Sequence, residues 1–314
     1  NDNNTAVGFK SLEFNTTGTQ NVAVGANALD ANTTSSNNTA IGYQAMTDAN
    51  GAVDSVAVGS EALANVTTAD NNVGVGFQAL KTITTSGDCV AVGFQALENN
   101  TAGNNTAVGS NALTANTTGA NNTGLGSASL DACTTGGGNT AVGREALGVL
   151  TTGGSNTAMG LNAGIVLTTG SNNLLLGLAA GHSSSPSGNI TTGSNNVCLG
   201  DNNITNAFIK VAFTVTSDQR DKIEDGVVSH GLDFVNQLKP KSFWFRKNRD
   251  SDEKHGDKRY GFYAQDILAL EGSDSVIINS KDSDNLKFKG DQLIPVLVNA
   301  IKELSAKVTA LEAG

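Results

Sequence analysis

Residues Asn105–Leu113 read Asn-Thr-Ala-Val-Gly-Ser-Asn-Ala-Leu, and close variants of this stretch recur along the first two thirds of the chain. The central glycines lie seventeen residues apart, with one interval of sixteen and one of twenty-three: Gly8, Gly25, Gly42, Gly59, Gly76, Gly93, Gly109, Gly126, Gly143, Gly160, Gly177 and Gly200. A period this strict is typical of stacked copies of one small structural unit. The sequence therefore predicts a repeat architecture for this part of the chain.

Each repeat carries characteristic residues at fixed distances from its glycine. An apolar residue such as Val108 stands directly before the glycine, and we expect it to face a continuous core. Asn stands four residues before the glycine in most copies, as at Asn105, and stacking would place these amides in a ladder. Leu stands four residues after the glycine in most copies, as at Leu113, and predicts a second inward strip.

The residue types between these positions favour short strands and turns. Thr-Ala-Val segments suit strands, and small polar runs such as Asn116–Gly119 suit turns. One coil of a parallel β-solenoid fits each period. An α-solenoid is disfavoured because every glycine in a helix would cost about 1 kcal/mol, and because no 3.6-residue apolar stripe persists along the repeats.

A change in charge density divides the chain. Residues 1–210 contain 4 Lys or Arg and 12 Asp or Glu, whereas residues 211–314 contain 15 and 17. We therefore expect a mainly β repeat shaft at residues 1–205, a connection at residues 206–216 with a strand over Phe208–Val215, and an α+β globular domain at residues 217–314.

Composition also argues against several classes of protein. The formal net charge of −10 leaves no basic stripe for nucleic acid. No apolar run is long enough for a membrane span, so we expect no membrane insertion. Cys89, Cys133 and Cys198 lack metal-site spacing, and we expect no metal and no cofactor. Because the chain begins Asn1-Asp2, we expect it to be the C-terminal piece of a longer protein.

Residues Thr216–Lys222 read Thr-Ser-Asp-Gln-Arg-Asp-Lys and allow two interpretations. In the structural one, Ser217 caps a helix and Lys222 is a solvated helix residue. In the chemical one, Lys222 is the general base for Ser217. A lysine can act in this way only where burial favours its neutral amine.

The last segment has a heptad pattern. Apolar residues spaced alternately by three and four predict a coiled-coil helix at residues 291–312: Ile294, Leu297, Ile301, Leu304, Val308 and Leu311. A single amphipathic helix that packs on its own domain remains the alternative, because the seam is short.

The repeat resembles the head repeats of trimeric autotransporter adhesins and the shaft repeats of many phage tail fibres. Residues 217–222 resemble the Ser-Asp-x-Arg-x-Lys signature of the self-cleaving intramolecular chaperone that ends endosialidases and other phage tailspikes and fibres. Leu238–Phe245 and Tyr260–Asp266 are similar to two further motifs of that family. Tyr263 and Asp266 depart from the Ile and Glu that are common there, and neither change touches the Ser217–Lys222 pair.

This resemblance implies a homotrimer in which residues 217–314 wind three chains into the shaft and then cut themselves off at the Thr216–Ser217 bond. Ser217 would be the nucleophile and Lys222 the base, with Asp218 and Arg220 in support. The only activity expected is this single-turnover cut.

The function implied is that of a phage tail fibre or tailspike in the virion tail, assembled in the host cytoplasm, which attaches to a glycan or protein receptor on the host surface. A bacterial or prophage-encoded adhesin with a permanent, uncleaved C-terminal trimerisation domain is the alternative. A polysaccharide hydrolase is disfavoured because the repeats offer few acids that could form a catalytic pair.

Overall fold

A computed structural model describes residues 3–210, 217–247, 249–273 and 275–314. The chain divides into two compact units, Asn1–Asn202 and Asn203–Gly314. The first unit contains the strands β1 (Thr5–Val7), β2 (Val22–Val24), β3 (Thr39–Ile41), β4 (Val56–Val58), β5 (Val73–Val75), β6 (Val90–Val92), β7 (Thr106–Val108), β8 (Thr123–Leu125), β9 (Thr140–Val142), β10 (Thr157–Met159), β11 (Leu174–Leu176) and β12 (Val197–Leu199). The second contains η1 (Gln219–Asp221), α1 (Leu232–Gln237), β13 (Lys241–Arg246), β14 (Lys254–Gly261), α2 (Ala264–Glu271), β15 (Ile278–Asn279), β16 (Lys287–Phe288), η2 (Gly290–Gln292) and α3 (Leu293–Glu312).

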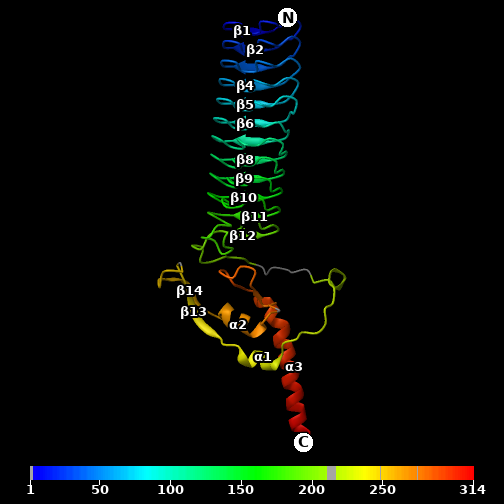
Figure 1. Ribbon diagram of the computed structural model, residues 1–314, viewed down its shortest axis with the longest axis vertical. Coiled ribbons are helices and arrows are strands. Elements are labelled where there is room, and N and C mark those ends of the chain that lie inside the picture. Colours follow the sequence, from blue (N-terminus) through cyan, green and yellow to red (C-terminus); the bar gives the residue numbers. More distant parts are fainter. Residues whose placement is uncertain (1–2, 211–216, 248, 274) are drawn as a thin grey trace. The chain divides into compact units, whose positions relative to one another are not determined.

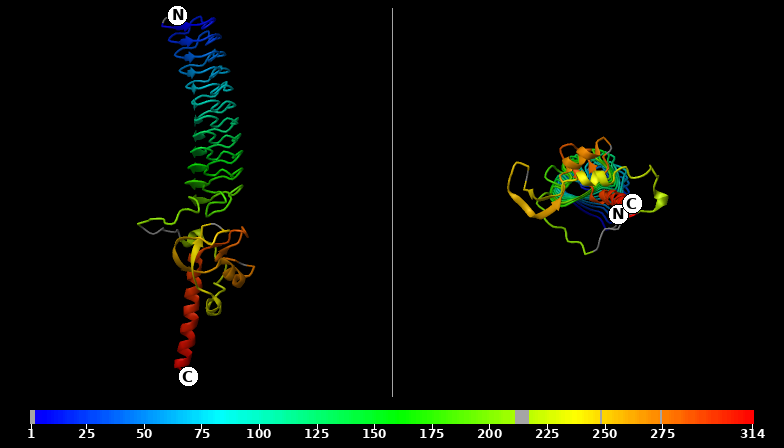
Figure 2. Two further views of the ribbon diagram at one scale, coloured as in Figure 1. Left: turned by 90° about the vertical axis from the view of Figure 1, so that its left-hand side faces the viewer. Right: turned by 90° about the horizontal axis from the view of Figure 1, so that it is seen from below.

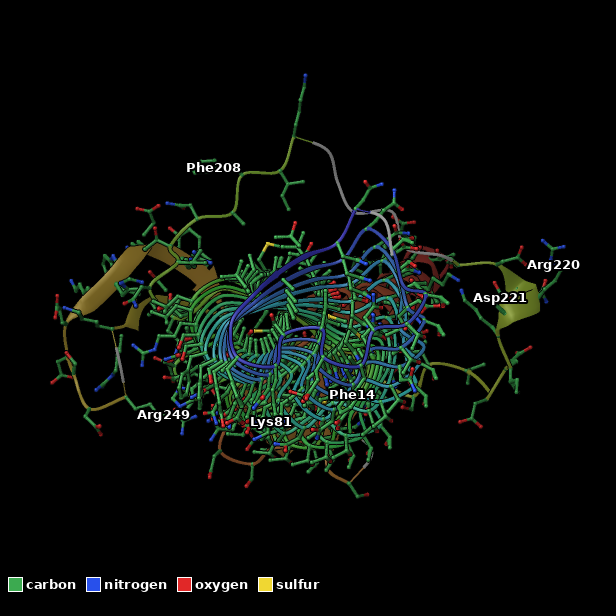
Figure 3. The ribbon with its side chains drawn as sticks, turned by 90° about the horizontal axis from the view of Figure 1, so that it is seen from above. Phe14, Lys81, Phe208, Arg220, Asp221 and Arg249 are labelled. Atoms are coloured by element: carbon green, nitrogen blue, oxygen red, sulfur yellow. The ribbon has the colours of Figure 1, made fainter. Side chains whose placement is uncertain are left out.

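The first unit is a parallel β-solenoid with one coil per sequence repeat, as the period predicts (Figures 1 and 2). The strands β1 to β12 pair in chain order within a single chain. Residues at the same position of successive repeats pair with each other, as Thr106 does with Thr123 and Val108 with Leu125. Seen along the solenoid, the coils lie over one another (Figure 3).

The predicted amide ladder runs through the interior of the solenoid. The Asn122 side-chain oxygen accepts from the backbone N–H of Asn139 at 2.9 Å, and Asn139 accepts in the same way from Asn156 at 3.0 Å. The Asn139 side-chain amide also donates to the Gly153 carbonyl oxygen at 2.9 Å. Each ladder amide therefore satisfies buried backbone groups that the short strands leave unpaired.

The prediction that the residue before each glycine faces the core is wrong. Val108 is 40% exposed and Met159 is 49% exposed, whereas the preceding Ala107 and Ala158 are fully buried. Successive strand residues point to opposite faces, so the inward Asn at position 105 also sends Ala107 inward and Val108 outward. In these two strands the alanine methyl group fills the interior position beside the Asn ladder, and the larger apolar side chain lies on the outside.

The second inward strip is confirmed, and its backbone is unusual. Leu113 is fully buried although its φ is 54°, in the left-handed region. That conformation destabilises a residue other than glycine by roughly 1–2 kcal/mol. Burial of a leucine side chain offsets this cost, because it stabilises the fold by about 1.5–3 kcal/mol. Gly164 occupies the equivalent slot of a later coil at φ 68°.

The glycine that marks the period is required by close stacking of the coils. Gly109 has φ 141°, and a Cβ there would lie 2.5 Å from the carbonyl carbon and oxygen of Gly126. Equivalent glycines of neighbouring coils face one another in the same way. The strict glycine period therefore records backbone contact between successive coils.

The second unit is a small α+β fold with its own core. Phe234 of α1, Ile267 of α2, Ile278 of β15 and Val296 of α3 pack together. The strands β13 and β14 form an antiparallel pair, as do β15 and β16. The Glu271 carboxylate is buried and accepts from three successive backbone N–H groups, the shortest at 2.5 Å, which fixes the chain between α2 and β15.

The predicted connecting strand is not seen where the structure describes the chain. Residues 206–210 form no strand, and the rest of the prediction, residues 211–216, lies outside the described residues. The helix predicted at residues 291–312 is present as α3, which begins at Leu293 and ends at Glu312.

Candidate functional site

A short turn at residues 218–222 of the second unit folds the chain back on itself. The 3-10 helix η1 begins after Asp218, whose carboxylate accepts from the backbone N–H of Arg220 at 2.9 Å. Lys222 ends the turn, and its N–H donates to the Gln219 carbonyl oxygen at 3.1 Å. Asp218, rather than Ser217, therefore caps this helix, which removes the capping role that the structural interpretation gave to Ser217.

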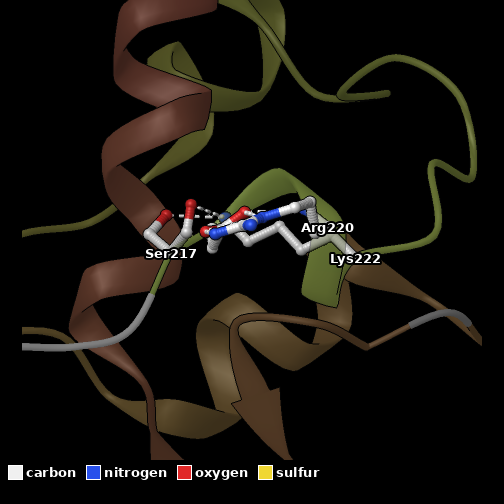
Figure 4. Close-up of polar contacts among 4 residues, drawn as sticks. Ser217, Arg220 and Lys222 are labelled. Carbon is white, nitrogen blue, oxygen red and sulfur yellow. Dashed lines mark hydrogen bonds and ion pairs between the residues drawn. The ribbon is translucent and has the colours of Figure 1, made fainter.

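The turn places Ser217 beside Lys222. The Lys222 ammonium nitrogen donates to Ser217 Oγ at 2.6 Å and to the Ser217 carbonyl oxygen at 3.3 Å (Figure 4). A contact of this length allows direct proton transfer between the two groups. Thr216, the other residue of the predicted cleavage site, lies outside the described residues.

Asp218 and Arg220 form an ion pair at the same turn. Arg220 Nη2 lies 2.6 Å from Asp218 Oδ2, and Arg220 Nε donates to both carboxylate oxygens (Figure 4). Hydrogen bonds from the Arg220 side chain, and then from its backbone N–H, lower the pKa of Asp218. The ion pair and the Asp218 cap therefore lie at the same turn, where Lys222 contacts Ser217.

This turn is open to solvent in the isolated chain. Ser217 and Lys222 are exposed, and the apolar residues that follow are uncovered, with Ile223 98% and Val227 93% exposed. A lysine amine serves as a base only where burial favours the neutral form. The single chain therefore supplies the geometry of a Ser–Lys pair without the burial that would activate it.

An apolar surface that the sequence interpretation missed runs along the solenoid. We call the residues directly before the repeat glycines the outer stripe: Val7, Val24, Ile41, Val58, Val75, Val92, Val108, Leu125, Val142, Met159, Leu176 and Leu199. Seven of them are at least 36% exposed, up to 58% at Val7 and Leu199. The alternation of strand residues could have revealed it, because the buried Asn ladder fixes which strand positions point inward.

A second apolar surface lies on α3. Leu293, Val296 and Ala300 are buried, while the predicted heptad positions stay exposed. We call these positions the α3 seam: Ile294 (60%), Leu297 (38%), Ile301 (65%), Leu304 (49%), Val308 (45%) and Leu311 (81%). The seam therefore does not pack on its own domain, contrary to the single-helix alternative.

Other kinds of site find little support. No group of three or more His, Cys, Asp or Glu side chains among the described residues is placed to hold a metal ion. Within the same part of the chain, no helix is both long and apolar enough to cross a membrane. Cys89, Cys133 and Cys198 are buried free thiols, and burial raises the pKa of Cys133 to about 11.

Comparison with known proteins bears on the second unit. Residues 217–274 match the family model described as the chaperone of endosialidase. The match begins at Ser217 and covers the turn with Lys222, all of β13 and β14, and α2. No curated protein and no solved structure was found to match the chain. The segment that carries the Ser217–Lys222 contact is therefore the segment that is similar to the endosialidase chaperone.

Proposed function

We propose that this chain is part of a phage tail fibre or tailspike that attaches the virion to a host surface, and that its C-terminal domain is a self-cleaving assembly chaperone. One observation carries the proposal: Lys222 lies 2.6 Å from Ser217 Oγ at the first residue of the segment similar to the endosialidase chaperone. The domain proposed to act as chaperone is residues 217–314, and the shaft is residues 1–205.

The proposed cut is an acyl shift followed by hydrolysis. Ser217 Oγ attacks the carbonyl carbon of Thr216 while the neutral Lys222 amine takes the hydroxyl proton. The bond from that carbon to the Ser217 nitrogen breaks, the nitrogen takes the proton back from Lys222, and an ester joins Thr216 to Ser217 Oγ. Water then hydrolyses the ester and leaves a Thr216 carboxylate and a free Ser217 hydroxyl.

Assembly as a homotrimer is supported by both apolar surfaces. The outer stripe and the α3 seam are exposed in a single chain, and exposed apolar patches of this extent mark interaction sites. Heptad spacing makes the α3 seam suitable for a bundle of parallel chains. Association would also cover the apolar residues near the turn, such as Ile223 and Val227, and supply the burial that a Ser–Lys pair needs.

The repeats give a physical reason for a separate assembly domain. A shift of one period between associated chains would exchange near-identical residues, so many registers have similar energy. A domain that joins three chains at their C-terminal ends would select one register before the coils associate. Its later removal would leave the assembled shaft protected by slow unfolding.

The exposed turn keeps one alternative open. If nothing buries Lys222 in the assembled protein, the C-terminal domain would be a permanent trimerisation cap, as in a bacterial or prophage-encoded surface adhesin. In either case we place the protein outside the cell, and for a phage fibre we place it in the virion tail after assembly in the host cytoplasm.

Intact mass of the purified chain tests the proposed cut. We expect wild type to give two fragments that meet between Thr216 and Ser217, and we expect Ser217→Ala and Lys222→Met to remain whole. Lys239→Met, a control at another exposed lysine of the same domain, should cleave like wild type. An uncut wild-type chain would favour the permanent cap.

A further inference from the structure

A polar pocket of about 320 Å³ lies on the outer surface of the solenoid, across the coils that follow Gly42, Gly59 and Gly76. Its polar lining comes from equivalent slots of successive coils: Gln44, Thr47, Asp48, Glu61, Asn65 and Lys81. Lys81 lies at the outer edge of the coils (Figure 3). The repeat therefore brings amide, carboxylate, hydroxyl and ammonium groups together on one surface.

A chain of side-chain hydrogen bonds fixes the groups on one wall of this pocket. Lys81 Nζ lies 2.6 Å from Glu61 Oε2, which also accepts from Gln78 Nε2 at 2.9 Å. Gln95 Nε2 in turn donates to Gln78 Oε1 at 3.1 Å. Ordering these side chains in advance reduces the entropy lost when a ligand binds. The pocket lining therefore presents both donors and acceptors, with two carboxylates, Asp48 and Glu61, and one ammonium group, Lys81.

Exposed aromatic rings occupy the slot beside this wall. Tyr43, Phe77 and Phe94 each follow a repeat glycine directly and are 52%, 40% and 49% exposed. The Phe77 and Phe94 rings stack, with centroids 5.4 Å apart and planes 18° apart. Backbone hydrogen bonds of 2.9 Å, from Glu61 to Tyr43 and from Gln95 to Phe77, tie this slot to the polar slot of the next coil.

The combination of exposed aromatic rings and fixed polar groups favours a saccharide over other ligands. A sugar ring offers an apolar C–H face, which an aromatic ring can cover, and adjacent hydroxyls, which carboxylate, amide and ammonium groups can bind in pairs. Nucleic acid is disfavoured by the acidic character of residues 1–210. A further copy of the chain would fit the apolar outer stripe better than a pocket with this many polar groups.

The spacing of the coils suggests how the ligand lies. Successive coils are about 4.8 Å apart, which is close to the length of one sugar unit in an extended glycan. Tyr43 and Phe94 are three coils apart and span roughly 14 Å. An extended glycan along the solenoid would therefore meet a polar side chain in every coil, from Gln44 to Gln95, whereas Ser60 interrupts the aromatic slot between Tyr43 and Phe77.

We propose that Tyr43, Phe77 and Phe94, with the pocket around Glu61 and Lys81, bind a linear oligosaccharide that lies along the solenoid axis. This site deepens the proposed attachment function and rests on it. It names the ligand as a glycan and places it on coils in the first half of the shaft.

The experiment measures binding of the purified full chain to an array of linear oligosaccharides from bacterial O-antigens and capsules, each printed as a length series. Tyr43→Ala, Phe77→Ala and Lys81→Met remove parts of the site. Leu161→Ala is the matched control, because Leu161 is 46% exposed and occupies the same slot as Tyr43 in a later coil. Melting temperature and oligomer mass are recorded for every variant.

We expect wild type to bind a subset of the glycans, with affinity rising until the oligosaccharide reaches from Tyr43 to Phe94. Each aromatic variant should lose about tenfold in affinity or more, as expected for loss of an aromatic contact. The control should bind like wild type, and all variants should keep the melting temperature and oligomer mass of wild type.

Three results would overturn the site. Wild-type binding that the variants do not weaken would leave attachment intact and move the ligand elsewhere. Loss of oligomer mass in the Tyr43 or Phe77 variant would make these rings an interface between chains. Absence of glycan binding by wild type would reject the ligand class, while the cleavage pattern of the same sample independently reports whether the assembly function stands.

Discussion

Replacement of Asn139 with alanine tests whether the amide ladder holds the solenoid together. Asn139 is fully buried, and its side chain is bonded to the backbone N–H of Asn156 and the carbonyl oxygen of Gly153. Alanine would leave both of these buried backbone groups without those partners. Each such group costs about 1–3 kcal/mol, so the free energy of unfolding of the solenoid should fall by about 2–6 kcal/mol.

The chain itself supplies a matched control for this substitution. Ser55 occupies the same slot in an earlier coil, and its hydroxyl oxygen accepts from the backbone N–H of Asn72 at 3.1 Å. Asn139→Ser should therefore keep an acceptor for the backbone N–H of Asn156 and lose the amide donor to the Gly153 carbonyl oxygen. We expect this variant to lose about 1–3 kcal/mol, roughly half the loss of the alanine variant.

Urea unfolding followed by far-ultraviolet circular dichroism measures both losses, because most of the regular structure that unfolds is the solenoid. The two variants should unfold in the order alanine, then serine, then wild type as urea increases. Equal stability of the alanine and serine variants, or an alanine variant within about 1 kcal/mol of wild type, would show that the Asn139 amide does not stabilise the solenoid.

Three further predictions follow from the stacking, the α3 seam and the buried thiols. In Gly109→Ala, the new Cβ would lie against the Gly126 carbonyl at a φ of 141°, so the free energy of unfolding in urea should fall by about 2–6 kcal/mol. Gly148→Ala is the control and should lose much less, because a Cβ there would have no contact under 3.3 Å. Equal losses of stability in the two variants would contradict close stacking of the coils at Gly109. If the chain forms the proposed trimer, Leu304→Glu should be monomeric in analytical ultracentrifugation, while the charge-reversal control Lys307→Glu should be trimeric. A trimeric Leu304→Glu would exclude the α3 seam as the interface. Because burial raises the pKa of Cys133 to about 11, about 0.1% of this thiol should be thiolate at pH 8. Its reaction with iodoacetamide should therefore be far slower in the folded chain than in urea. Equal reaction rates in the two conditions would show that the thiol is not buried.

The repeat pattern was sufficient to predict the solenoid, and it was misleading about one of its faces. The glycine period, the Asn ladder and the Leu strip all reflect contacts between identical slots of adjacent coils, and such contacts appear directly as sequence period. The expectation that Val108 faces the core rests on the apolar residue that precedes the glycine in every copy of the repeat. Hydrophobicity alone could not show which of two adjacent apolar residues faces the core. The alternation of strand residues could, because Ala107 lies two positions after the inward Asn105 and Val108 lies three positions after it.

The contact between Ser217 and Lys222 could be anticipated from the sequence, whereas the solvent exposure of the pair could not. The spacing of Ser217 and Lys222 allowed contact, but the contact depends on the 3-10 turn capped by Asp218, a role that the sequence interpretation gave to Ser217. Burial of a lysine depends on surfaces remote in sequence or on other chains. No local pattern around Lys222 carries that information.

In the proposed function, residues 217–314 assemble the shaft and then leave it. The most direct test is the solution mass of two forms of residues 1–216: the form released by cleavage of the whole chain, and the form produced alone without residues 217–314. We predict that the released shaft is a trimer that keeps its circular dichroism after the C-terminal domain is removed, and that the shaft produced alone is monomeric or aggregated. A released shaft that is monomeric, or two forms with the same trimeric mass, would contradict the account.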